Sequence, residues 1–130
     1  MHQIYNNIGD NMSNTTIQLI RGDYKAFNLT FTQNGVPLDL TDYVLMFTAK
    51  ESTADDDDEA VILKDVEVTT NPELGIVLLE LEAEDTDIEP GTYVYDFQLV
   101  DGDGKPTTVM MGTLEIAADV TRRVIEGELS

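Results

Sequence analysis

The chain has 130 residues, of which 26 are acidic and 7 basic, so its formal net charge at pH 7 is −19. That charge disfavours nucleic acid and anionic membranes as partners, because their phosphates are bound by Lys and Arg. A hydrophobic fraction of 42% is ordinary for a globular chain, and the length suits one domain with a real core. The absence of Cys excludes disulfides, thiolate metal sites and a cysteine nucleophile.

Residues 1–14 are predicted to form a flexible polar arm, because Asn, Gln, Gly and Ser dominate them. Their apolar anchors are Ile4, Tyr5 and Ile8, which we expect to order against a neighbouring molecule and therefore treat as interaction candidates. The segment lacks the basic cluster and apolar run of a secretory signal, and no stretch approaches the roughly 20 apolar residues that cross a bilayer. We therefore expect synthesis in the cytoplasm and no membrane partner.

From residue 16 the chain is predicted to form short strands separated by turns. Residues 16–21 and 24–32 come first, and the Asn-Gly pair at Asn34 then favours a tight hairpin turn. Pro37 has no N–H to donate, so residues 36–40 are expected at a sheet edge or in a crossover. Residues 43–50 restore the alternation of a strand with one buried face.

An acidic loop is predicted over residues 51–59, which hold four consecutive Asp residues. Several carboxylate oxygens together are what Ca²⁺ prefers, so the weak metal candidates are Asp55, Asp56, Asp57, Asp58 and Glu59. Adjacent side chains of an extended loop diverge, however, and a mobile, solvated charge run is the favoured interpretation. No other metal site and no cofactor is expected.

The second half of the chain continues the pattern of strands. Residues 76–81 are apolar on both faces, which is typical of a central strand. Residues 83–88 are too short and acidic for more than one helical turn. Strands are also expected at 60–70, 92–100 and 107–117. Gly112, inside the last of these, indicates a bulge or a close backbone approach.

The most informative segment runs from Pro90 to Phe97. Pro90 and Gly91 supply a turn, and Tyr93, Tyr95 and Phe97 then alternate with polar or smaller residues. A turn, a Gly-x-Tyr and an alternating strand resemble the corner that leads into a late strand of an immunoglobulin-like domain, with Tyr95 where an antibody domain has its second Cys. The chain is therefore predicted to be all-β, an immunoglobulin-like antiparallel sandwich of about seven to eight strands.

Catalysis is not expected. His2 is the single His and belongs to the predicted arm, so nothing would hold it as a base. Carboxylate pairs such as Glu80 and Glu82 lie on acidic segments flanked by turns, where burial would not separate their pKa values. Arg21-Gly22-Asp23 has the form of an adhesion tripeptide, but it also has the form of an ordinary turn between strands, which we favour.

Several short motifs, taken in order, resemble the immunoglobulin-like N-terminal domain of phage baseplate upper proteins. They are residues 20–23, 38–41, Gly75, residues 90–98, residues 104–105, Gly112 and residues 119–122. The resemblance covers about residues 16–123, so we place the domain at 15–123 and a tail at 124–130. In that family the domain attaches a longer tail or receptor-binding protein to the baseplate. This chain stops soon after the domain, and either a fragment or a small free-standing virion component is compatible with it.

The resemblance implies a virion structural protein of the tail or baseplate, with other phage structural proteins as partners and homo-oligomers around a symmetry axis. Arg122 and Arg123, the adjacent basic pair, would dock on an acidic patch of an adjoining copy or partner. The alternative is a capsid decoration or head-fibre anchoring protein on the capsid surface. A weaker alternative is a bacterial surface adhesion module that Ca²⁺ stabilises.

Overall fold

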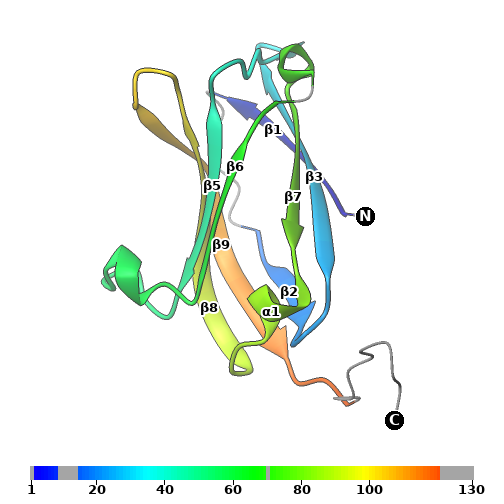
Figure 1. Ribbon diagram of the computed structural model, residues 1–130, viewed down its shortest axis with the longest axis vertical. Coiled ribbons are helices and arrows are strands. Elements are labelled where there is room, and N and C mark those ends of the chain that lie inside the picture. The colour runs from blue at the N-terminus through cyan, green and yellow to red at the C-terminus, as the bar shows by residue number, and fades with distance from the viewer. Residues whose placement is uncertain (1, 9–14, 70, 121–130) are drawn as a thin grey trace.

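The computed structural model describes residues 2–8, 15–69 and 71–120, which form a sandwich of two β-sheets (Figure 1). Nine strands lie within these residues, together with three helical turns. The four-stranded sheet contains β1 (His2–Ile8), β3 (Lys25–Gln33), β4 (Val36–Pro37) and β7 (Ile76–Leu81). The five-stranded sheet has the order β2 (Ile17–Ile20), β9 (Pro106–Ala117), β8 (Gly91–Val100), β5 (Val44–Lys50) and β6 (Ile62–Glu67). The predicted all-β sandwich is confirmed.

Strand pairing is antiparallel except at the two N-terminal strands. β1 pairs in parallel with β3, and β2 pairs in parallel with β9, whereas β3–β4, β3–β7, β5–β6, β5–β8 and β8–β9 are antiparallel. The expected hairpin turn joins β3 to β4, and Asn34 and Gly35 both have positive φ, as a type I′ turn requires. The two parallel pairings, of β1 and of β2, are the exceptions to the antiparallel pairing that the sequence predicted.

The core fills the space between the sheets because alternate side chains of each strand face inward. Four Phe residues are almost completely buried, and three aromatic rings meet at its centre. The Phe47 ring centroid lies 4.9 Å from that of Phe97 and 5.9 Å from that of Tyr95. Each such side chain contributes about 1.5–3 kcal/mol through its removal from water. The four buried Phe residues are Phe27, Phe31, Phe47 and Phe97.

The N-terminal segment differs from the predicted arm. Residues 2–8 form β1, whose backbone lies beside β3 with His2 opposite Phe27 and Ile8 opposite Gln33. The physical reason is that β3 would otherwise leave a row of N–H and C=O groups unpaired, and an extended segment of any composition can satisfy them. The prediction of a flexible arm rested on polar composition alone, which does not report backbone pairing of this kind. The predicted tail at 124–130 lies outside the described residues.

β7 is an edge strand and not the predicted central one. Within residues 15–69 and 71–120 it pairs with β3 alone. Val77, Leu79 and Leu81 are buried, whereas Ile76 and Leu78 are 39% and 42% exposed. Apolar side chains on both faces usually indicate burial on both, but here no other described element forms a second layer over the outer face, which stays partly exposed.

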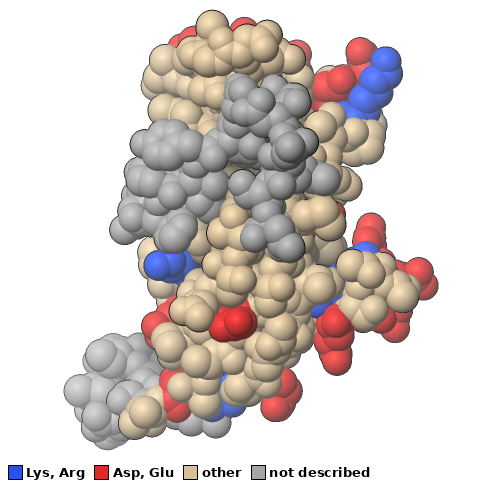
Figure 2. All heavy atoms as spheres, turned by 180° about the vertical axis from the view of Figure 1, so that it is seen from behind, with Lys and Arg blue, Asp and Glu red and all other residues tan. Residues whose placement is uncertain are grey.

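Three short helical turns connect the strands. They are η1 (Asp57–Glu59), η2 (Pro72–Leu74) and α1 (Ala83–Thr86). Carboxylates gather on the loops at the margins of the molecule, as the view from behind shows (Figure 2). None of the helices in the described part of the chain is long and apolar enough to cross a membrane.

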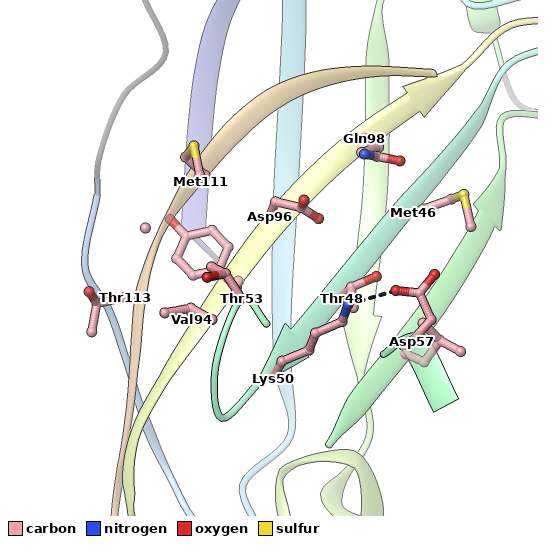
Figure 3. A pocket seen from close by; sticks show the side chains of 13 residues that line it. Met46, Thr48, Lys50, Thr53, Asp57, Val94, Asp96, Gln98, Met111 and Thr113 are labelled. Atoms are coloured by element: carbon pink, nitrogen blue, oxygen red, sulfur yellow. Dashed lines mark ion pairs between the residues drawn. The ribbon is translucent and has the colours of Figure 1, made fainter. Parts of the chain in front are cut away.

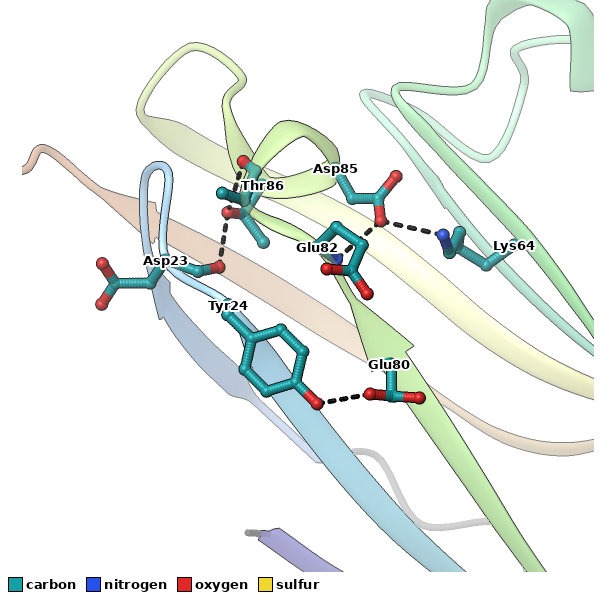
Figure 4. A network of polar contacts seen from close by, with 8 residues as sticks. Asp23, Tyr24, Lys64, Glu80, Glu82, Asp85 and Thr86 are labelled. Atoms are coloured by element: carbon teal, nitrogen blue, oxygen red, sulfur yellow. Dashed lines mark hydrogen bonds and ion pairs between the residues drawn. The ribbon is translucent and has the colours of Figure 1, made fainter. Parts of the chain in front are cut away.

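The turn after β2 and helix α1 are joined by a network of polar contacts (Figure 4). The fully buried hydroxyl of Thr86 donates to the backbone oxygen of Asp23 at 2.7 Å, and the Gly22 N–H donates to the Thr86 backbone oxygen at 3.2 Å. Asp85 caps α1 by accepting the Glu82 N–H and also pairs with Lys64 of β6 at 2.9 Å. The residues of the Arg-Gly-Asp tripeptide thus form a turn that anchors one end of the sandwich.

Thr86→Val is expected to lower the free energy of unfolding by about 1–3 kcal/mol, because it leaves the Asp23 carbonyl without its buried donor while nearly preserving volume. Chemical denaturation of the purified protein measures this. Thr107→Val, at an exposed position of β9, is the matched control and should change stability little. Equal stability of the two variants would contradict the role given to the Thr86 hydroxyl.

Candidate functional site

The outer face of the five-stranded sheet carries an open groove of about 630 Å³, here called the outer groove (Figure 3). Its floor is built by side chains that alternate with the buried ones. Tyr93, Tyr95 and Phe97 of β8 are buried in the sandwich, so Val94 and Asp96 face outward. β5, β6 and β9 add further lining side chains, namely Met46, Thr48, Leu63 and Met111.

Strand register places the groove side chains in rows across the sheet. Asp96 lies opposite Thr48 of β5 and opposite Met111 of β9, and Thr48 lies opposite Leu63 of β6. One row therefore reads Leu63, Thr48, Asp96, Met111, with neighbouring strands about 4.8 Å apart. A register shift in the β8–β9 pairing between Phe97 and Gln98 adds a bulge, which bends this hairpin.

One wall of the outer groove is the acidic loop, and an ion pair holds it there. The Lys50 ammonium lies 2.7 Å from the Asp57 carboxylate and donates to the Asp55 backbone oxygen at 3.0 Å. The hydrogen bond with Asp57 raises the pKa of Lys50. The sequence predicted a mobile loop and did not predict this contact, because Lys50 belongs to the preceding strand and not to the loop.

Asp96 is the half-buried carboxylate on the groove floor. Burial raises its pKa, and the nearby Lys50 ammonium works in the opposite direction. Across residues 15–69 and 71–120, no hydrogen bond or ion pair reaches this carboxylate, since Lys50 pairs with Asp57 instead. The groove therefore holds a partly desolvated carboxylate to which none of these described residues forms a bond.

The weak calcium candidates lie in the acidic loop and converge in part. Carboxylate oxygens of Asp56, Asp58 and Glu59 lie within 4.8 Å of one another, but all three residues are exposed. Glu59 also accepts the Asp56 N–H at 3.0 Å, so one of these carboxylates already caps η1. Calcium binding at Asp55–Glu59 stays a weak prediction, and the solvated loop remains the favoured interpretation.

Two tyrosine hydroxyls fix the start of β8. The Tyr93 hydroxyl donates to the backbone oxygen of Glu89, across the turn formed by Pro90 and Gly91. The Tyr95 hydroxyl donates to the backbone oxygen of Thr15 at 2.7 Å. Gly112 lies opposite Tyr95 on β9, and its missing side chain leaves room for Thr15. These contacts tie the chain that enters β2 to the β8–β9 hairpin.

Alkaline pH tests the burial of Tyr95. Burial raises its pKa from 10.0 to about 12, so the unfolded chain loses this proton at lower pH than the folded chain. The contribution of the Tyr95 hydroxyl to the free energy of unfolding is therefore fully present below pH 10 and is lost between pH 10 and about 12. In denaturation experiments across this window, we expect the free energy of unfolding of Tyr95→Phe to fall less steeply with pH than that of the wild type. Curves that stay parallel up to pH 12 would contradict the shift.

The predicted interaction residues lie partly outside the described part of the chain. Ile4, Tyr5 and Ile8 belong to β1, at the register positions of Leu29, Thr30 and Gln33. Arg122 and Arg123 lie outside the described residues. The interaction roles of all five stay predictions. The outer groove was not predicted from the sequence, because its side chains come from strands up to 67 residues apart, with Met46 and Thr113 at the extremes.

A comparison with known protein families identifies the family of this chain. The model of the BppU N-terminal domain matches residues 2–109, and the chain belongs to this N-terminal-domain family of the phage baseplate upper protein. The resemblance seen in the sequence is thereby confirmed. It is a family of structural baseplate domains. A search of curated protein sequences gave no match.

One of the solved structures that match the chain supports its fold. The chain is similar to the structure described as the N-terminal domain of phage TP901-1 ORF48, with 14% identity, a TM-score of 0.57, and coverage of 89% of this chain and 97% of that one. CopC from Methylosinus trichosporium OB3b gives 13% identity, coverage of 82% and 87%, and a TM-score of 0.46. At such identities the TP901-1 domain supports the fold alone.

Proposed function

We propose that this chain is an attachment module of the phage tail or baseplate, and that its sandwich binds other virion proteins. The observation that carries the proposal is the family match over residues 2–109, which includes strands β1 to β8 and the start of β9. A structural role in the tail or baseplate follows from that family. The partner proteins and the contact surfaces are the parts that we add.

The charge of the chain supports protein partners with basic surfaces. The net charge is −19, and the described part of the chain already uses three of the seven basic side chains in internal ion pairs. Arg21 pairs with Asp119 at 2.7 Å, Lys50 with Asp57, and Lys64 with Asp85. The surface therefore presents mainly carboxylates, which speed encounters with cationic partners and repel nucleic acid.

Assembly of several copies around the tail axis is a further part of the proposal. Arg122 and Arg123 are the adjacent cations that could contact an acidic surface of a neighbouring copy or partner. Reversing both charges, as Arg122→Glu with Arg123→Glu, should reduce incorporation into particles. Unchanged incorporation would remove these residues from the interface.

Fractionation of purified particles tests the proposed location. Heads and tails are separated and this chain is quantified in each fraction by mass spectrometry, with the major capsid protein and a tail tube protein as markers. We expect the chain to follow the tail marker. Recovery with the capsid marker would favour a decoration or head-fibre anchor instead, and absence from both fractions would contradict a virion role.

A further inference from the structure

We infer that the outer groove binds an extended segment of another virion protein in which Lys or Arg stands beside apolar side chains. The inference rests on the proposed function and adds the contact surface and the chemistry of the partner. It is drawn from the row Leu63, Thr48, Asp96, Met111 and from the acidic wall beside that row.

The ends of this row are apolar and exposed. Leu63 is 54% exposed and Met111 is 41% exposed, although both lie on a sheet face and not at a loop tip. Met46 and Val94 line the same groove in the neighbouring rows. Covering such side chains removes apolar surface from water, and an apolar patch with a polar rim is typical of a protein interface. The occupant must therefore bring apolar side chains.

The carboxylate in the middle of the row favours a cationic group on the partner. The Asp96 carboxylate is half-buried, and no hydrogen bond or ion pair reaches it from the described part of the chain. Lys50 is held by Asp57 and by the Asp55 carbonyl, which leaves Asp96 available to an incoming donor. A guanidinium or ammonium over Asp96 would form a charge-assisted hydrogen bond where water is already partly excluded.

The acidic loop extends this preference beyond the groove floor. Its carboxylates stand beside the groove because Lys50 fixes Asp57 at the wall. They attract a basic segment and guide it toward Asp96. The folded body of a second copy is poorly matched, since each copy carries a net charge of −19 and the described residues hold three basic side chains in internal ion pairs. The Arg122-Arg123 segment of a second copy is the competing occupant, and the crosslinks described below distinguish it from a different protein. The complementary occupant is therefore a basic, partly apolar segment of a different protein.

Photo-crosslinking in assembled particles tests this inference. Met111 is replaced by photoreactive benzoylphenylalanine, and the matched control carries it at Leu74, which is 48% exposed on η2 and does not line the groove. Particles that contain each variant are irradiated, and the crosslinked peptides are sequenced by mass spectrometry. We expect the Met111 probe to capture a segment of another virion protein that contains Lys or Arg beside apolar residues. The Leu74 probe should not capture that segment.

A charge variant gives the second measurement. In the Met111 probe background, Asp96→Asn should reduce the crosslink yield by about fivefold or more, because it removes the charge and keeps the volume. Asp103→Asn, at an exposed hairpin tip, should leave the yield unchanged. The melting temperatures of both variants confirm that they are folded.

Different experimental outcomes would contradict the groove inference and the proposed function. Particles that contain the protein but give no Met111 crosslink, give one to another copy of this chain, or give an undiminished yield with Asp96→Asn would overturn the groove inference and leave the virion role intact. Absence of the wild-type protein from particles would instead contradict the proposed function, and the groove inference with it.

Discussion

Phe97→Ala is expected to lower the free energy of unfolding by about 3–5 kcal/mol, the largest effect of any substitution considered. Phe97 is fully buried, and its ring centroid lies 4.9 Å from that of Phe47 and 5.7 Å from that of Tyr95. Its removal opens a cavity between the two sheets, and the rings of Phe47 and Tyr95 each lose one of their packing partners. Chemical denaturation followed by circular dichroism measures the loss.

The control for Phe97 is its neighbour in the same strand. Gln98 faces the opposite side of the sheet, and its amide donates to the Thr108 hydroxyl at a long 3.3 Å. Gln98→Ala should cost no more than about 1 kcal/mol. If the two alanine variants lost similar stability, the placement of Phe97 in the core would be wrong.

Gly112→Ala is expected to destabilise the fold by about 1–3 kcal/mol, which is large for the addition of one methyl group. A Cβ atom at this position would come within 2.9 Å of the Thr15 backbone nitrogen and closer still to the Thr15 carbonyl oxygen. That carbonyl also accepts the Tyr95 hydroxyl, so relieving the clash disturbs a second contact. Thermal unfolding of the purified variant measures the effect.

Gly102→Ala is the matched control for Gly112. Gly102 lies in the loop between β8 and β9, where an added Cβ would meet the Asp42 Cβ atom at 3.3 Å, a tight contact but without the backbone overlap found at Gly112. We expect a small change in the melting temperature of this variant. If Gly112→Ala were as stable as Gly102→Ala, the close approach of Thr15 to β9 would be contradicted.

Local alternation accounts for what the sequence predicted well. Tyr93, Tyr95 and Phe97 alternate with outward side chains, and this period of two depends only on neighbouring residues. The Asn34-Gly35 turn is equally local, because positive φ at both positions selects the hairpin. Gly112 was predicted as a bulge or a close approach. It is a close approach to Thr15, while the bulge lies a few residues earlier in β9.

Properties that depend on pairing between distant strands could not be predicted in the same way. β7 has apolar residues on both faces and still lies at an edge, because no described strand pairs with its other side. β1 is polar in composition and still pairs with β3, because backbone groups make the contact. The outer groove required the register that brings Asp96 beside Thr48 and Met111. The alternation of residues along β8 predicts which face of the sheet Asp96 lies on, but it does not predict which residues of β5 and β9 lie beside it.

A cryo-electron microscopy map of the phage particle tests the attachment role most directly. We expect density at the tail end into which the two-sheet sandwich fits, with the acidic loop at residues 51–59 and the β8–β9 hairpin recognisable. Protein from a different virion component should contact the sandwich there. Copies bound only to the capsid shell, or a complete tail end without this sandwich, would contradict the attachment role.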